Sequence, residues 1–294
     1  MRFLRLSATR TSRLLLAGVV APLSLGLVGL APLASSETAR AAVAAGPGAG
    51  ASQATANGQS RGSVGLKPRT KLRPSGPVTI RRNGTVLKRL DIRGGVRVEA
   101  KRVKIRNSRI RGNGTGNGVQ VTRGGSVVIK DSEISDFSNG IAYSNWTARR
   151  VEIHSMTADG VKLGSNVKLL DSWIHDLTPG AGAHADGGQV QSGVRNTKIV
   201  GNTIDAGRGN AALFISPSLG PSSSGPVKIR DNSLDGGNFT LFVVDGAHGK
   251  YVIKDIRVVG NVFGRNHRYG ASRTNVPVRW RDNRYADTLE AIRR

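Results

Sequence analysis

The sequence predicts an all-β fold in which short parallel strands stack as the coils of a β-solenoid. An eight-residue pattern, V-x-I-x-D/N-S/N-x-I, recurs at spacings of 19–30 residues. Apolar residues alternate inside each copy, which is the period of a strand and not of a helix. A second short strand follows an Asn-Gly or Asp-Gly pair in several units. Units of 20–30 residues with two or more strands and no helical segment are typical of parallel solenoids.

The first strand of each unit closes on an apolar residue that we expect to point into the core. The copies are VKIRNSRI (103–110), VVIKDSEI (127–134), VKLLDSWI (167–174), TKIVGNTI (197–204), VKIRDNSL (227–234), IRVVGNVF (256–263) and VRWRDNRY (278–285). A weaker copy, RRVEI, ends at Ile153. Stacking these copies would align Ile110, Ile134, Ile153, Ile174, Ile204, Leu234, Phe263 and Tyr285 in one column.

The second strand of each unit begins at a Gly, Asn or Asp. It reads NGVQV (117–121), NGIAY (139–143), DGVKL (159–163) and DGGQV (186–190), with NAALFI (210–215) and FTLFVV (239–244) as looser members. We interpret these glycines as turn residues, because glycine tolerates a left-handed backbone.

A column of small polar residues accompanies the repeat, formed by Ser108, Ser132, Ser172, Asn202, Asn232, Asn261 and Asn283. With this column, the repeat and the Asn-Gly and Asp-Gly pairs, the chain resembles right-handed parallel β-helix proteins of the pectate-lyase-like superfamily. The opening segment 66–94 and the stretch 184–189, His-Ala-Asp-Gly-Gly-Gln, are similar to a group of secreted bacterial β-helix proteins. The resemblance implies a single right-handed parallel β-helix of about eight coils over 66–285. The superfamily includes lyases, hydrolases, epimerases and non-enzymatic modules, and the polygalacturonase signatures are not found in this sequence.

The two ends of the chain are predicted to lie outside the solenoid. Residues 1–41 have the features of a signal peptide: an Arg-containing start, an apolar run over 14–33 and a small-residue cleavage site at 39–41. An uncleaved anchor is the alternative, because the apolar run is long enough to span a bilayer. Residues 42–65 are predicted to form a disordered Ala/Gly/Ser linker, and residues 286–294 a C-terminal tail or cap. We therefore expect a secreted monomer without a membrane segment after cleavage.

Composition limits the function classes. The 294 residues include no Cys, which excludes disulfides, thiolate metal sites and Cys nucleophiles. Aromatic residues make up only 4% of the chain, too few for a base-stacking platform, so we expect no nucleic-acid partner. The net charge of +25 comes from the ends: 67–111 holds 16 basic and 2 acidic residues, 257–294 holds 9 and 3, and 112–256 holds 13 of each. This distribution favours an acidic polysaccharide or wall polymer as partner, and charge that serves only solubility is the alternative.

Equivalent positions of successive coils lie about 4.8 Å apart, so residues distant in sequence can form functional columns. The position after each closing apolar residue includes His154, His175 and Asp205. In one interpretation His154 binds substrate, while His175 and Asp205 support the reaction or protonate a leaving oxygen. In the other, all three are solvated turn residues on an outer edge.

The second strand supplies another outward column, with a protruding loop beside it. Lys162 and Gln189 share this column. The surplus residues 178–184 of the next unit are expected to protrude from the coil. Asp159 and Asp186 hold a turn position where earlier units have Asn, so backbone capping is an alternative to a catalytic role for both. The full set of candidates is His184, Lys162, His175, Asp186 and Asp205 for catalysis, and Gln189, Gln191, His154 and Arg208 for substrate binding.

Two reaction classes could use these residue types. A lyase neutralises a uronate carboxylate and removes the C5 proton, for which Lys162, His184 and Gln189 are suited, with His184 or Lys162 as the base. A hydrolase places two carboxyl groups across the scissile bond, and Asp186 with Asp205 is the best available pair.

The sequence therefore predicts a secreted carbohydrate-active protein that acts on an acidic polysaccharide, with β-elimination favoured. A glycoside hydrolase and a non-enzymatic wall- or glycan-binding solenoid are the alternatives. No motif requires a cofactor. Ca²⁺ is left open as a neutraliser of carboxylates, and a metal site formed by His154, His175 and His184 is a weaker hypothesis, because no tight ligand spacing supports it.

Overall fold

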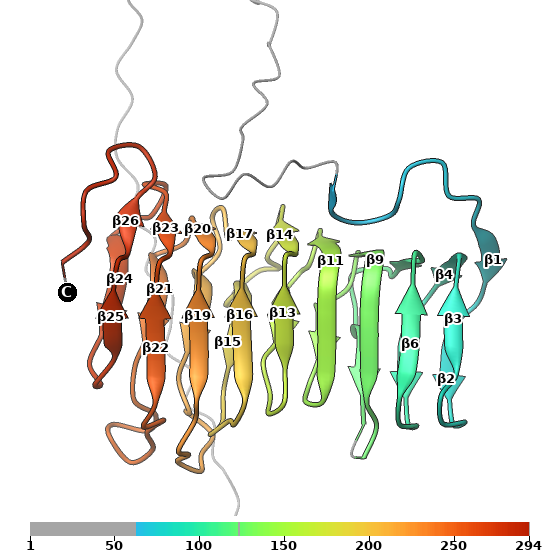
Figure 1. Cartoon of the computed structure of the whole chain (residues 1–294), viewed down its shortest axis with the longest axis horizontal. Coiled ribbons are helices and arrows are strands. Elements are labelled where there is room, and N and C mark those ends of the chain that lie inside the picture. Colours follow the sequence, from blue (N-terminus) through green and yellow to red (C-terminus); the bar gives the residue numbers. More distant parts are fainter. Residues whose placement is uncertain (1–62, 123, 294) are drawn as a thin grey trace, which may run out of the picture. The chain divides into compact units, whose positions relative to one another are not determined.

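A computed structural model describes residues 63–122 and 124–293, whose strands β1–β26 stack as one right-handed parallel β-helix (Figure 1). This confirms the predicted fold class. The predicted signal peptide and most of the predicted linker lie outside the described residues. Of the part of the chain that is described, no helix has the length and hydropathy needed to cross a membrane.

One side of the β-helix is a nine-stranded sheet in which each coil contributes one strand. Every pairing is parallel, and inward residues of successive strands are register partners, as Val78, Val96 and Val119 show. In chain order the strands are β2 (Val78–Ile80), β5 (Val96–Val98), β8 (Asn117–Val121), β10 (Asn139–Ala142), β12 (Val161–Lys162), β15 (Asp186–Val190), β18 (Ala211–Ile215), β21 (Phe239–Val243) and β24 (Gly270–Thr274).

A seventeen-stranded sheet closes the coils as two rows of strands. The first row, which stands side by side in Figure 1, contains β3 (Val86–Lys88), β6 (Val103–Arg106), β9 (Val127–Ser135), β11 (Trp146–His154), β13 (Lys168–Leu170), β16 (Thr197–Val200), β19 (Val227–Arg230), β22 (Ile256–Val259) and β25 (Arg279–Arg281). The second row contains β1 (Arg73–Ser75), β4 (Leu90–Arg93), β7 (Arg109–Arg111), β14 (Trp173–His175), β17 (Thr203–Asp205), β20 (Ser233–Asp235), β23 (Val262–Phe263) and β26 (Arg284–Tyr285). The long strands β9 and β11 belong to both rows.

A residue with left-handed backbone turns the chain from the first row to the second in every coil. The φ angles at this corner lie between 48° and 69°, at Arg89, Asn107, Asp131, Arg150, Asp171, Gly201, Asp231, Gly260 and Asp282. Asn, Asp and Gly tolerate this conformation best, which explains why they hold the fifth position of most repeats. The repeat is thus two strands joined by a corner, and not one strand.

The residue after the corner builds a buried polar ladder. Nδ2 of Asn202 donates to Oδ1 of Asn232 at 2.9 Å, and Nδ2 of Asn232 donates to Oδ1 of Asn261 at 2.9 Å. The backbone N–H groups of both residues donate to the same acceptors, at 2.9 and 3.0 Å. This ladder is the predicted Ser/Asn column. Beside it the closing apolar residues stack in the predicted order, and all but Tyr285 are at most 1% exposed.

The glycines of the Asn-Gly and Asp-Gly pairs have a different role from the predicted one. Gly118, Gly140, Gly160 and Gly187 do not adopt a positive φ. A Cβ at any of them would instead overlap a carbonyl oxygen of the next coil and the Cγ2 atom of an isoleucine in the second row. Their interpretation as left-handed turn residues is therefore wrong, because glycine is required here by close packing between the sheets.

The nine-stranded sheet has one strand for each coil, so the described chain forms nine coils, one more than the approximate number of eight that the sequence predicted. The additional coil is the first, over 78–93, whose segments lack the repeat pattern. At the other end, residues 286–293 fold back over the last coil. Ile292 is buried, its carbonyl accepts from Nε1 of Trp280 at 2.9 Å, and Ala291 forms a bridge with Arg284.

Candidate functional site

Lys162, on β12, lies at the centre of the candidate site. Its ammonium group forms an ion pair with Asp159 and donates a hydrogen bond of 2.5 Å to Oε1 of Gln189. Gln189 is the register partner of Lys162 in β15, so the predicted column exists. The two contacts hold a positive charge in place while 20% of the lysine side chain stays exposed.

Polar residues at the start of successive strands form a hydrogen-bonded column that contains two carboxyl groups. Oδ1 of Asp159 accepts the backbone N–H of Asp186 at 2.9 Å. Oδ1 of Asp186 accepts from Nδ2 of Asn210 at 2.9 Å. In earlier coils Asn139 donates to Asn117 in the same manner, at 3.0 Å. Backbone capping is therefore one role of Asp159, and the ion pair described above is another.

Burial raises the pKa of both carboxyl groups. Asp159 and Asp186 are only 1% and 0% exposed. Desolvation, assisted by the negative charge of Asp159, raises the pKa of Asp186 to about 8, so this side chain is mostly neutral at neutral pH. Desolvation also raises the pKa of Asp159, although Lys162 opposes the shift. Among the described residues Oδ2 of Asp186 has no hydrogen-bond partner.

A groove of about 330 Å³ opens above Lys162. Gln189 and Gln191 line it together with the lysine, so three of the predicted candidates meet there. The lining also includes two exposed large side chains, Tyr143 and Leu219, with 52% and 71% of their surfaces exposed. The groove therefore combines a fixed cation, two amides and an aromatic face, which are groups suited to an anionic sugar.

His184 and Arg208 lie in exposed segments. His184 belongs to the loop between β14 and β15, and its electrostatic interaction with Asp159 is one of the effects that oppose the rise in the pKa of that carboxyl. The histidine is therefore within electrostatic reach of the pair formed by Asp159 and Lys162. Arg208 lies between β17 and β18, and neither it nor His184 is among the residues that line the groove.

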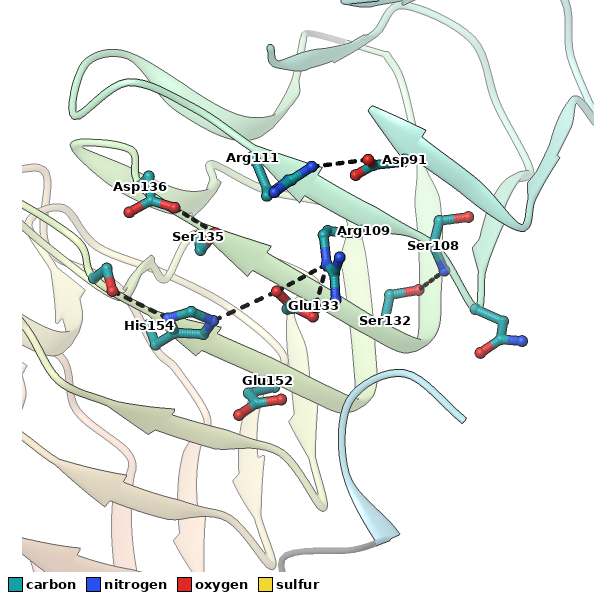
Figure 2. A network of polar contacts seen from close by, with 12 residues as sticks. Asp91, Ser108, Arg109, Arg111, Ser132, Glu133, Ser135, Asp136, Glu152 and His154 are labelled. Atoms are coloured by element: carbon teal, nitrogen blue, oxygen red, sulfur yellow. Dashed lines mark hydrogen bonds and ion pairs between the residues drawn. The ribbon is translucent and has the colours of Figure 1, made fainter. Parts of the chain in front are cut away.

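His154 belongs to a separate polar network on the outer face of the second row (Figure 2). Its Nε2 lies 3.7 Å from Oε1 of Glu133, and its Nδ1 lies 3.0 Å from the hydroxyl of Ser155. Arg109, one coil earlier, contacts the same glutamate at 3.0 Å. The nearby carboxylate of Glu133 raises the pKa of His154 despite burial. Burial raises the pKa of Glu133, but the contacts with His154 and Arg109 outweigh it and lower that pKa.

His175 occupies the next position of the same column and is held on four sides. Its Nδ1 lies 2.7 Å from Oδ2 of Asp176, and its Nε2 lies 3.2 Å from Oε1 of Glu152. Its ring stacks on Trp173 at 3.5 Å and on His154 at 5.3 Å between centroids. The predicted histidine column is present, but its members bind one another and their acidic neighbours.

The remaining predicted combinations do not come together in the described part of the chain. Asp205 lies in the seventeen-stranded sheet, where its Oδ1 accepts from Gly207 N–H at 2.8 Å and closes a turn. No hydrogen bond or ion pair among these residues joins it to Asp186, which lies in the nine-stranded sheet. Over 63–122 and 124–293, no group of three or more His, Asp or Glu side chains is arranged to hold a metal ion.

A second and larger groove, of about 730 Å³, lies over the N-terminal coils. Its polar lining includes Arg93, Arg111, Asn113 and Asp136. Arg111 is paired with Asp91 at 2.8 Å. This groove offers hydrogen-bond donors and positive charge, and it is the alternative location for a ligand.

Sequence reasoning missed the two exposed large side chains of the Lys162 groove and one contact of the lysine. Tyr143 directly follows β10, and Leu219 lies in the loop after β18. At such positions the alternation of a strand no longer predicts which way a side chain points. The pairing of Asp159 with Lys162 was missed because a spacing of three residues is unremarkable in a strand. The contact between Asn210 and Asp186 could have been predicted, because Asn210 continues the column of Asn and Asp residues at the strand starts.

Comparison with known proteins gives one match. A family model described as a right handed beta helix region matches residues 94–278. No curated protein and no solved structure matches the chain.

Proposed function

We propose that this chain, which belongs to the right-handed β-helix family, is a secreted enzyme that cleaves an acidic polysaccharide by β-elimination. The carrying observation is the cation of Lys162, held between Asp159 and Gln189 in an open groove beside Tyr143. A fixed positive charge in a groove favours a sugar that carries a carboxylate. The signal-like start of the sequence supports export, and the buried Ser/Asn ladder supports a place in the pectate-lyase-like superfamily.

In the proposed reaction Lys162 and Gln189 bind the uronate carboxylate, which makes the neighbouring C5 proton more acidic. His184 accepts that proton. The electron pair of the broken C5–H bond forms the C4–C5 double bond, and the C4–O bond breaks with its electrons leaving on the oxygen. The leaving oxygen takes a proton from solvent, to which the groove is open. Lys162 is not the base in this scheme, because its ammonium group is already engaged by Asp159 and Gln189.

Hydrolysis is less well supported by the same geometry. Both carboxyl groups near the groove, Asp159 and Asp186, are almost completely buried, whereas a hydrolase needs two carboxyl groups that reach the scissile bond. His175 and Asp205 have other partners, and we assign them no role in the reaction.

The test is incubation with a panel of uronate polymers, with and without Ca²⁺. A lyase produces an unsaturated sugar that absorbs in the ultraviolet. Replacing the base in His184→Ala should lower that rate by roughly 10²-fold or more, and Lys162→Met should lower it as well. The matched control is His248→Asn, which changes another exposed loop histidine and should leave the rate unchanged.

Three results would contradict the proposal. Reducing ends without ultraviolet absorbance would indicate a hydrolase. Retention on the polymers without any product would indicate a binding solenoid. Equal rates for His184→Ala and His248→Asn would remove His184 from the reaction.

A further inference from the structure

The outer face of the first row carries a basic side chain on each of its nine strands. Register pairing connects the first four directly and the last five directly, with a sideways step of two residues between β11 and β13. We call this set the cation path: Lys88, Arg106, Lys130, Arg149, Lys168, Lys198, Lys228, Arg257 and Arg279. The strands on which these residues lie are those that stand side by side in Figure 1.

The cation path is unfavourable for the stability of the fold. Like charges on directly opposed residues of neighbouring strands repel and destabilise a sheet. Only two members have an ion pair in the described structure: Arg149 with Asp171 at 2.9 Å, and Arg257 with Asp255 at 2.7 Å. Asp255 also attracts Lys228 and Arg279 over a longer distance. Surface charge that serves solubility alone intersperses both signs. An in-register row of one sign therefore indicates a ligand.

The C-terminal half of the path is also hollowed. A groove of about 200 Å³ lies among Lys228, Arg257 and Arg279, with Arg230 and Arg281 on its other side. These two additional arginines occupy the neighbouring outward positions of β19 and β25. A ligand in this groove would meet cations along both of its edges.

The spacing of the path indicates the shape of the ligand. Neighbouring strands are about 4.8 Å apart, so the nine cations extend for roughly 40 Å along the axis of the β-helix. A matching polymer is extended and carries anionic groups at regular intervals along one side. The phosphates of a DNA duplex follow a helical course instead, and single strands are bound by stacking on aromatic residues. No aromatic residue is among the outward positions of the path and its neighbouring column in the described strands.

We infer that the cation path is a second binding site, for a linear acidic polysaccharide, on a different sheet from the Lys162 groove. The site holds the polymer by charge and performs no chemistry. This inference is independent of β-elimination, because an inactive protein would bind through the path equally well.

The test compares the affinity of the whole chain for long polygalacturonate with that of a path variant, Lys198→Gln/Lys228→Gln/Arg279→Gln. None of these three residues has an ion pair in the described structure. We expect binding at low salt to weaken by about tenfold or more, and the dependence of log affinity on log salt to become shallower by about one for each cation removed. The melting temperature should change little, because the relief of repulsion among the cations offsets the lost attraction of Lys228 and Arg279 to Asp255.

The matched control, Arg82→Gln/Arg195→Gln/Lys254→Gln, removes three positive charges from exposed residues that are not members of the path. This variant should bind nearly as tightly as the natural protein. Equal weakening of both variants would overturn the inference, because net charge alone would then explain binding. Tighter binding of duplex DNA of equal charge would overturn it in favour of a nucleic acid. A loss of polymer binding in Lys162→Met, with none in the path variant, would place all binding in the groove.

Discussion

At the scale of single residues, Asp186 has the most unusual environment in the described chain. Its carboxyl group is inaccessible to solvent, accepts from Asn210 and neighbours a second buried carboxylate, Asp159. The fold accommodates it by favouring the protonated form. The ion pair between Lys162 and the neighbouring Asp159 is therefore not opposed by a second full negative charge at neutral pH.

The raised pKa of Asp186 predicts a pH dependence of stability. In the unfolded chain this carboxyl loses its proton near pH 4, but in the fold its pKa is about 8. The native state thus holds more protons between these values, and the free energy of unfolding should fall as pH rises from about 4 to about 8. In the natural protein this fall should be on the order of a few kcal/mol, and it should be absent in Asp186→Asn.

Urea denaturation of both proteins across this pH range measures the effect. Contributions of groups that do not interact with Asp186, such as Glu133 and His154, cancel in the difference between the two proteins, whereas the coupled carboxyl of Asp159 contributes to it. Asp282→Asn, at an exposed corner, is the control and should retain the natural profile. Parallel curves for the natural protein and Asp186→Asn would show that Asp186 is ionised in the fold.

The sequence predicted this site only in part, for a physical reason. The neighbourhood of Lys162 and Gln189 follows from alternation along strands and from coil stacking, both of which are visible in the repeat. The burial of Asp159 and Asp186 depends on how tightly adjacent coils cover them, and residue order does not encode this distance. Polar residues at a strand start look the same whether they cap a turn in solvent or lie beneath the next coil.

At the scale of elements, close packing between the two sheets decides which residues start the strands of the nine-stranded sheet. Gly160 shows this clearly, because a Cβ there would overlap the carbonyl oxygen of Gly187 and lie 2.6 Å from Cγ2 of Ile174. Both neighbours are themselves fixed, one by the backbone and one by the core.

Gly160→Ala should therefore destabilise the fold by about 1–3 kcal/mol, the usual cost of overpacking. Chemical denaturation measures this change. Gly76→Ala is the control, because no heavy atom lies within 4 Å of its added Cβ, and it should change stability by well under 1 kcal/mol. If the two variants were equally stable, the sheets would be free to separate at this column.

Elements that follow the repeat were predictable, and elements without it were not. Ile110 and Ile134 align as expected, because β-branched residues at period two identify an inward column. The first coil was not counted, because Val86 and Leu90 there do not continue that pattern. The corner at Asn107 divides one predicted strand into two, since a single left-handed residue changes direction without interrupting the polar-apolar order.

At the scale of the whole molecule, the ends of the β-helix are its vulnerable surfaces. An uncovered last coil presents unpaired N–H and C=O groups and the edge of the core. Residues 286–293 cover this end, with Ile292 buried and bonded through its carbonyl to Trp280.

Ile292→Asp should release this cover by burying a charge. We expect the free energy of unfolding, measured by urea denaturation, to fall by a few kcal/mol. We also expect self-association, measured by size-exclusion chromatography. Arg293→Asp alters the adjacent exposed residue and should leave both measurements unchanged. A stable, monodisperse Ile292→Asp protein would mean that the last coil needs no cover.

The corner between the two rows is equally long in every described coil, with one left-handed residue followed by one residue at the ladder position, which is apolar at Leu90 and Val151 and Ser or Asn in the other coils. All variation in coil length consequently falls on the other two connections, such as 176–185 before β15 and 216–226 after β18. Both connections border the nine-stranded sheet. Insertions gained during evolution could thus reshape the rim of the Lys162 groove while leaving the ladder unchanged. Each coil therefore has one corner of fixed length and two connections of variable length, and loops that recognise a ligand can diversify only at those two connections.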